Sequence, residues 1–170
     1  MQMTHYMQLL ADNQPWNLIL FMAIPVILAE TIAVSELYIL FTRKFTGWAK
    51  KLNSIASIIV GLYFIGVFFY LMNSAVIPLT QGGQWRGFAD VIAVGFYLLG
   101  VVPLGGLALI ELGIIKRGAM PEDKLRLHAT FVAIFLVVAH IAMIFGMINP
   151  TVLGWVPPTV IDMPMASMSQ

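Results

Sequence analysis

The sequence predicts an all-α integral membrane protein: an up-down bundle of four transmembrane helices that forms a single domain over residues 1–170. Apolar residues make up 60% of the chain and charged residues only 10%, whereas soluble domains carry about 25% charged residues. The apolar residues form four continuous runs, approximately 16–42, 52–77, 88–115 and 125–149. Each run exceeds the roughly 20 residues that a helix needs to cross a bilayer, and the lack of period-two alternation favours helices over a β-barrel.

The polar residues Asp12, Asn13 and Gln14, followed by Pro15, are expected to be the lead-in to the first helix. The segment 1–14 lacks the basic residues and the short apolar region of a signal peptide, so we expect the first span to be an uncleaved insertion signal. Tryptophans flank the predicted spans, as in an interfacial aromatic belt: Trp16, Trp48, Trp85 and Trp155.

The basic residues predict the orientation of the spans. Eight of the nine Lys and Arg residues lie in or beside the connection after the first span and the connection after the third span. They are Arg43, Lys44, Lys50, Lys51, Lys116, Arg117, Lys124 and Arg126. Connections rich in Lys and Arg stay in the cytoplasm. We therefore expect both basic connections inside and both termini on the outer side.

Short connections join the spans, so consecutive helices are expected to be antiparallel. Pro25 and Pro103 lie near the middle of the first and third spans and are expected to kink them. Pro121 and the two acidic residues after it have the pattern of a helix start, because proline suits the first turn and acidic groups complement the helix dipole. Glycines in the third span indicate close approach to a neighbouring helix.

Ionisable residues inside the spans are the main functional candidates, because hydrocarbon strongly disfavours them. Counting from the basic residues at about 1.5 Å per residue converts sequence position into depth. Glu36 lies seven residues before Arg43, and Glu111 lies five before Lys116. His128 lies two residues after Arg126. The sequence therefore predicts a layer of two carboxylates and one imidazole near the cytoplasmic side.

A second layer is predicted near the middle of the membrane. Glu30 lies thirteen residues before Arg43, and His140 lies fourteen after Arg126. Tyr63 and the segment 103–106 fall at the same depth by the same count.

Spacing limits the metal chemistry of a single helix. Glu30 and Glu36 are about 9 Å apart along the helix, so one metal ion cannot readily bind both. His128 and His140 are about 18 Å apart and cannot be the two axial ligands of one haem. His140, Met143 and Met147 share a helix face, which is typical of packing as well as of a ligand set.

Soft or borderline metal ligands also gather near the termini: Met1, Met3, His5, Met7, Met163, Met165 and Met168. Thioether and imidazole groups suit Cu(I), although flexible tails produce such clusters without a metal. The chain has no cysteine, which excludes disulfides, thiolate metal sites and iron–sulfur clusters.

Three long segments carry a resemblance that covers most of the chain: WNLILFMAIPVILAETIAVSELYILFTRKFTGW, ADVIAVGFYLLGVVPLGGLALIELG and LRLHATFVAIFLVVAHIAMIFGM. They resemble a family of small bacterial four-helix membrane proteins loosely labelled permease-like. The resemblance implies a multi-pass protein of the bacterial inner membrane and implies no particular substrate or cofactor. Small b-type cytochromes typically place haem-binding His on more than one helix, whereas this chain places both of its intramembrane His on one.

Three functions stay open. The first is a small permease-like or ion-binding transport protein that moves a cation or small solute with proton coupling, with the midplane layer as its central site and the other layer leading to the cytoplasm. Four helices leave little room for alternating access, so we expect a homo-oligomer or a partner in a membrane complex. The bilayer is the expected surrounding, no nucleic-acid partner is expected, and no catalytic residue is predicted.

The second function is a membrane metal- or haem-binding redox protein, with a metal ion or haem b as its cofactor. Its candidate ligands are Glu30, Glu111, His128, His140, Met143 and Met147. No span has the Glu-x-x-His spacing of di-iron bundles, whereas a haem shared by His140 of two copies stays open. The third function is a non-catalytic accessory subunit, in which buried polar groups specify helix pairing.

Overall fold

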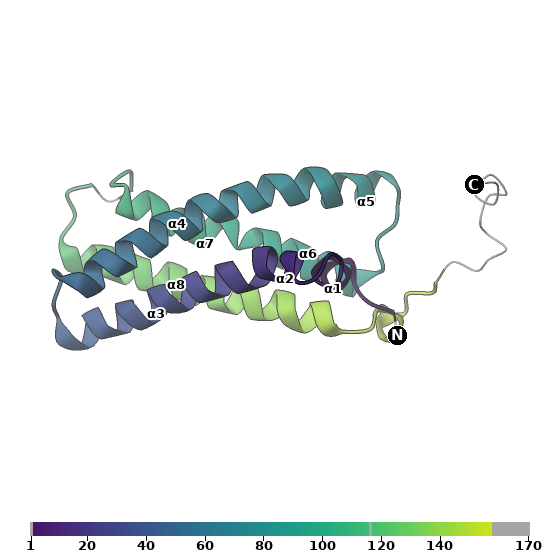
Figure 1. The fold of residues 1–170 in the computed structure, drawn as a ribbon, viewed down its shortest axis with the longest axis horizontal. Helices are drawn as coiled ribbons and strands as arrows, with labels where there is room; N and C mark the ends of the chain where they lie inside the picture. Colours follow the sequence, from purple (N-terminus) through teal and green to yellow (C-terminus); the bar gives the residue numbers. More distant parts are fainter. Residues whose placement is uncertain (1, 116, 158–170) are drawn as a thin grey trace.

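The computed structural model describes residues 2–115 and 117–157, and every regular element within these ranges is a helix (Figure 1). Four helices are long and apolar enough to cross a membrane: Trp16–Thr42, Trp48–Gln81, Phe88–Glu111 and Pro121–Met147. The prediction of an all-α chain with four apolar spans is confirmed. The second and fourth helices each begin four residues before the predicted start, and the third ends four residues early.

The first long helix consists of α2 (Trp16–Leu18), the π-helical segment η1 (Ile19–Ala23) and α3 (Ile24–Thr42). Pro25 explains the π-helical segment, because proline has no N–H for the carbonyl four or five residues earlier. Side chains of other helices satisfy both carbonyls. Tyr97 Oη donates to the carbonyl of Phe21 at 2.7 Å, and Tyr63 Oη donates to that of Leu20 at 2.8 Å. The proline at which a kink is expected is thus the point where hydrogen bonds join three helices.

The second long helix repeats this pattern. It consists of α4 (Trp48–Leu71), the π-helical segment η2 (Met72–Val76) and α5 (Ile77–Gln81). Pro78 stands two residues after the π-helical segment, as Pro25 does in the first helix. The predicted span ends at residue 77, immediately before the proline. In the structure the helix continues through the π-helical turn and Pro78 to Gln81.

The third long helix is interrupted at Gly100, between α6 (Phe88–Leu99) and α7 (Val101–Glu111). Pro103 lies in the first turn of α7, where its missing N–H breaks the hydrogen-bond pattern with the preceding turn. The helix ends at Glu111 because the chain then turns through Gly113, whose φ of 72° is in the left-handed region.

The fourth long helix, α8 (Pro121–Met147), begins with the predicted Pro121. Glu122 and Asp123 stand in its first turn. This start confirms the helix-start pattern. A short 3₁₀ helix, η3 (Pro150–Leu153), follows.

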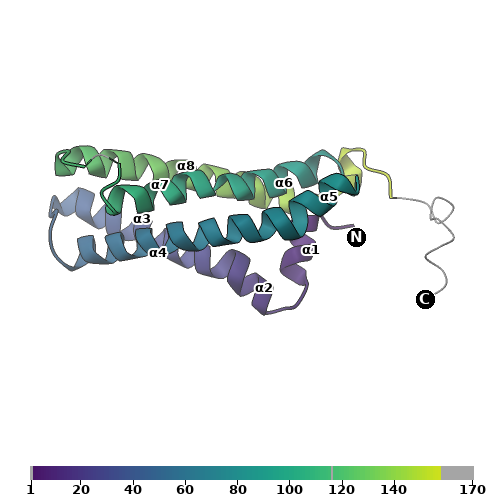
Figure 2. The ribbon, with the colours of Figure 1, turned by 90° about the horizontal axis from the view of Figure 1, so that it is seen from above.

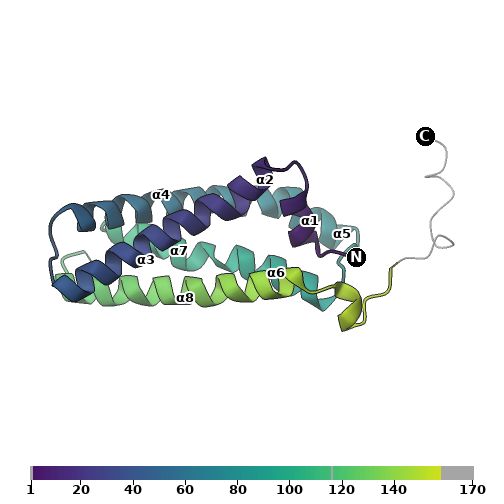
Figure 3. The same cartoon turned by 60° about the horizontal axis from the view of Figure 1, so that its bottom comes forward.

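A short helix that the sequence does not predict precedes the first span. Residues His5–Ala11 form a helix, α1, that packs against α2, α6 and α8 (Figure 3). Tyr6 and Leu10, one helical turn apart, are buried. Thr4 caps the helix by accepting a hydrogen bond from the Met7 N–H at 3.2 Å, and its hydroxyl donates to the carbonyl of Gly146 at 2.6 Å. Burial of one apolar stripe explains why this short segment is helical.

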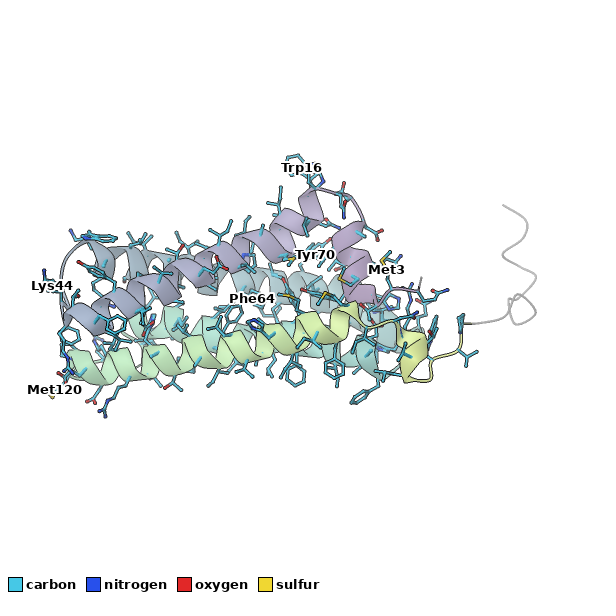
Figure 4. The ribbon with its side chains drawn as sticks, turned by 90° about the horizontal axis from the view of Figure 1, so that it is seen from below. Met3, Trp16, Lys44, Phe64, Tyr70 and Met120 are labelled. Atoms are coloured by element: carbon cyan, nitrogen blue, oxygen red, sulfur yellow. The ribbon has the colours of Figure 1, made fainter. Side chains whose placement is uncertain are left out.

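The four long helices lie side by side, and consecutive helices run in opposite directions (Figures 1 and 2). The closest packing joins α4 to α7, α6 to α8, and α3 to α4. Glycines permit two of these approaches: a Cβ at Gly61 would meet the Leu104 carbonyl of α7, and a Cβ at Gly106 would meet the Phe131 ring of α8. The connections that join α3 to α4 and α7 to α8 lie at the end of the molecule opposite to α1. Figure 4 shows Lys44 and Met120 at that end and Met3 at the other.

Candidate functional site

A buried glutamate–histidine pair lies toward the basic end of the molecule, between α3 and α8. His128 Nδ1 is 2.5 Å from Glu36 Oε2, and each residue is no more than 3% exposed. The second oxygen, Glu36 Oε1, is buried and has no hydrogen-bond partner among the described residues. A carboxylate oxygen in this state is uncommon, because buried polar atoms normally have partners. The pair is therefore a candidate for binding a proton or a ligand.

The Nε2 edge of the imidazole points toward α7. Glu111 Oε1 lies 3.8 Å from His128 Nε2, so the imidazole stands between carboxylates of two helices. Glu111 has closer partners on α4. Lys50 Nζ donates to Glu111 Oε1 at 2.6 Å, and Ser54 Oγ donates to Glu111 Oε2 at 2.6 Å. Four ionisable residues from four helices thus form one cluster, which we call the Glu36–His128–Glu111–Lys50 cluster.

Small polar side chains of α3 and α4 orient the cluster. Ser57 Oγ donates to the Asn53 carbonyl at 2.7 Å, so its lone pairs face His128 Nε2 at 3.0 Å. Asn53 Nδ2 donates in turn to Ser35 Oγ and to the Ile32 carbonyl, both at 3.1 Å. These bonds lock α3 to α4 beside the imidazole.

The hydrogen bonds define how many protons the pair holds. Because Ser57 gives its hydrogen to a carbonyl, Nε2 carries the hydrogen in the contact with Ser57. A second proton lies between Nδ1 and the Glu36 carboxylate. Glu36 and His128 therefore hold two protons together, either as carboxylate and imidazolium or as carboxyl and neutral imidazole. In both forms the four-residue cluster has no net charge.

A cavity of about 290 Å³ adjoins the cluster. Its polar lining consists of Thr46, Lys50, Asn53, Glu111, Lys124 and His128. Phe45 and Ala119, from the two basic connections, also line it, so the cavity lies at the basic end of the molecule. The volume is at the lower end of the range for small-molecule sites.

The structure brings Glu36, Glu111 and His128 together, as the depth count predicts, and it adds Lys50, which serves in the sequence analysis only as a topological signal. The second predicted layer does not assemble. Glu30 and His140 are both exposed on the outside of the molecule. Within the described part of the chain, His140 Nδ1 bonds to the Leu136 carbonyl of its own helix, at 2.6 Å.

The other members of the predicted midplane layer have structural roles. Tyr63 holds the carbonyl freed by the first proline, and the segment 103–106 is buried against α4 and α8. Counting along a helix gives depth correctly, but depth does not determine which way a side chain points. Glu30 and His140 therefore cannot form a central site within one copy of the chain.

The candidate metal ligands are also dispersed. Within residues 2–115 and 117–157 no group of three or more His, Asp or Glu side chains is placed to hold a metal ion. Met143 lines a small apolar cavity between α3 and α8, whereas Met147 is exposed. The three residues of the His140, Met143, Met147 stripe thus have different surroundings, and the ligand set that they could form stays a prediction.

A second polar cluster, which the sequence does not predict, lies at the opposite end. His5 Nδ1 is 2.6 Å from Asp90 Oδ2, and the His5 N–H donates to Asp90 Oδ1 at 2.6 Å. Asp90 is fully buried. Arg86 joins α1 to this cluster through bonds to the Met3 carbonyl and to Gln8 Oε1. The only signal in the sequence is an aspartate in the first turn of an apolar span.

These contacts give His5, one of the candidate copper ligands, a structural partner. Met3 and Met7 are the described methionines of that group, and His5 is held by a carboxylate. Met1, Met163, Met165 and Met168 lie outside the described residues.

The four apolar helices and the buried polar cluster between them define a multi-pass membrane protein. The chain belongs to a family of unknown function (DUF6803), whose model matches residues 1–162. No match to the chain was found among curated proteins or among solved structures.

Proposed function

We propose that the chain is a small permease-like protein of the bacterial inner membrane that binds a small solute together with a proton at the Glu36–His128–Glu111–Lys50 cluster. The observation that carries this proposal is the position of His128, which is buried between carboxylates of two other helices and faces a cavity. In the proposed topology, an up-down four-helix bundle places the two basic connections in the cytoplasm and both termini outside. The cavity then lies on the cytoplasmic side.

The cluster suits proton binding. Histidine and glutamate residues inside a membrane commonly form proton relays. Loss of the proton shared by Glu36 and His128 would leave one net negative charge in a buried site. Such a charge is unfavourable unless a neighbouring group moves, and a charged ligand bound beside the pair changes this balance. Proton release from this pair is therefore expected to depend on whether the ligand is bound.

The cavity lining favours an anionic solute over the cation considered in the sequence analysis. Lys50 and Lys124 both line the cavity, and the only acidic group among its lining residues is Glu111. A small anion such as a carboxylate or inorganic phosphate would compete with Glu111 for Lys50. Glu111 would then be free to pair with His128 Nε2, 3.8 Å away, and would favour the protonated imidazole. Anion binding and proton binding would thus support each other.

The test uses purified protein in liposomes that contain a pH-sensitive dye. Inorganic phosphate, succinate or glutamate is added outside, with potassium chloride as a cation control. We expect one of the anions to acidify the lumen through the wild-type protein. Lys50→Gln and His128→Gln should reduce the initial rate by at least about tenfold, since each removes one of the coupled charges.

The adjacent residue provides a matched control. Lys51 is exposed on the same helix, has the same charge as Lys50 and lies outside the cluster. Lys51→Gln should keep the wild-type rate. Equal rates for Lys50→Gln and Lys51→Gln would contradict the proposal, and so would acidification that is no faster with any of the three anions than with potassium chloride at the same potassium concentration.

A further inference from the structure

The outer surface of α3 and α8 carries two ionisable residues that face away from the core. Ile32 is fully buried, and Glu30 precedes it by two residues, which is about 200° around the helix. Ala142 is 1% exposed, and His140 precedes it by two residues. Both side chains therefore point away from the centre of the molecule. Glu30 lines a shallow outer groove with Thr31 and Val34 of α3 and with Trp48 and Leu52 of α4.

The two residues are neighbours in depth and in position around the molecule. Each lies about four turns from the basic residue at the cytoplasmic end of its helix, at Arg43 and Arg126. The helices that carry them, α3 and α8, contact each other, and Val26, one turn before Glu30, lines the same small cavity as Met143, one turn after His140. The flanks of α3 and α8 that carry Glu30 and His140 thus adjoin, and one side of a single copy presents an acid and a base at the same depth. Neither side chain has a partner on another helix within the described part of the chain.

Ionisable groups in the middle of a membrane face the protein interior or a partner, because hydrocarbon strongly disfavours them. We infer that a second copy of this chain covers the face formed by α3 and α8, with Glu30 of each copy paired with His140 of the partner subunit. A two-fold axis along the membrane normal brings the same patch of both copies together, so an acid and a base on one patch form two identical pairs. Charge complementarity at matched depth distinguishes this occupant from lipid or from an unrelated helix.

A cross-linking experiment tests the face directly, because the chain has no native cysteine. Ile27→Cys is placed in a copy with one affinity tag, and Ile144→Cys in a copy with another. Ile27 and Ile144 are exposed and lie one turn from Glu30 and His140, both toward the outer side. Oxidation of co-expressed copies should give a disulfide-linked dimer that carries both tags. Because the cysteines are on separate copies, a bond within one copy cannot produce this result.

Phe69→Cys serves as the matched control in place of Ile27→Cys. Phe69 is also an exposed apolar residue in a span, and it lies eighteen residues after Lys51, as Ile144 lies eighteen after Arg126, so the two share a depth, but Phe69 belongs to α4. Mixed-tag dimers should be at least about tenfold more abundant for the 27 and 144 pair than for the 69 and 144 pair. Equal yields would overturn the inference. The charged residues are unchanged in this experiment, so a folding defect of a charge variant does not affect it.

The role of the charges is tested by counting copies in lipid nanodiscs by single-molecule photobleaching. Glu30→Gln and His140→Gln should each lower the dimer fraction at least about fivefold, and the exchanged variant with Glu30→His and His140→Glu should restore it. A wild-type protein that is monomeric at every density tested would overturn the inference. An exchanged variant that stays monomeric would overturn the pairing of these two residues. None of these readouts depends on transport, so the dimer and the proposed function can fail separately.

Discussion

His128 and Glu36 form a buried pair with 2.5 Å between Nδ1 and Oε2, although 92 residues separate them in the sequence. The pair joins the helix that carries the first span to the helix that carries the last. Taking the two groups out of water is unfavourable, and their attraction offsets this only while both are present. The stability of the fold and the proposed function therefore depend on the same two side chains.

Removal of one member should destabilise the fold more than removal of both. We expect His128→Leu to lower the free energy of unfolding by roughly 3 to 5 kcal/mol, because it leaves the Glu36 carboxylate buried without its partner. The combined Glu36→Leu and His128→Leu variant should be more stable than His128→Leu alone. Reversible unfolding in mixed detergent micelles measures both values. If the double variant is less stable than either single variant, the pair contributes net stability and this account is wrong.

The tyrosines at the first π-helical segment give a second prediction. Tyr97→Phe should lower the free energy of unfolding by about 1 to 3 kcal/mol, because it leaves the Phe21 carbonyl without a donor. Pro25→Ala supplies a backbone N–H, so the same Tyr97→Phe change should be less harmful in the Pro25→Ala background. Tyr70→Phe is the control, since Tyr70 is exposed. Equal losses with and without Pro25 would show that the hydroxyl does not replace the missing N–H.

Sequence reasoning found the features that depend on position along a helix. The four apolar runs predicted the spans. Counting from the basic residues at the span ends placed Glu36, Glu111 and His128 at one depth. The role of Lys50 in the cluster was not predicted, because a lysine at the end of a span looks the same in the sequence whether it faces water or a carboxylate. Its contact with Glu111 became visible only when α4 was packed against α7.

The failures have a different physical origin. Glu30 and His140 share a depth, but each lies about 200° around its helix from a core-facing residue, Ile32 or Ala142. A span that is apolar on all sides does not indicate which of its faces points toward the core. The helix α1 is only seven residues long and has a single buried pair, Tyr6 and Leu10, which is too weak a pattern to predict a helix. Asp90 had no visible partner because His5 is 85 residues away in the sequence.

Close packing between α4 and α7 gives a third prediction, with its control on the same helix. A Cβ at position 61 would lie 2.5 Å from Ala108 Cβ and 2.6 Å from the Leu104 carbonyl oxygen. Gly61→Ala should therefore lower the free energy of unfolding by about 1 to 3 kcal/mol through overpacking. Gly66 has no atom within 4 Å of the added carbon, so Gly66→Ala should be neutral or stabilising by up to about 1 kcal/mol. Equal effects of the two substitutions in the unfolding assay would contradict the close contact between α4 and α7 that Gly61 permits.

The packing of α1 predicts a loss of stability at alkaline pH. Burial raises the pKa of Tyr6 from 10.0 to about 12, because the phenolate is poorly solvated there. Below pH 10 the side chain is neutral in the folded and unfolded states, and its contribution is fully present. Between pH 10 and 12 the unfolded state loses the proton first, so stability should fall by about 2 kcal/mol by pH 12.

Ultraviolet titration of the tyrosines, with protease cleavage of the segment 1–14, follows this step. Tyr6→Phe should remove the step in the ultraviolet titration near pH 12 and make cleavage less sensitive to pH between 10 and 12, because phenylalanine keeps the apolar contact and cannot ionise. If cleavage in Tyr6→Phe rises over that range as it does in the wild type, another group controls the release of α1.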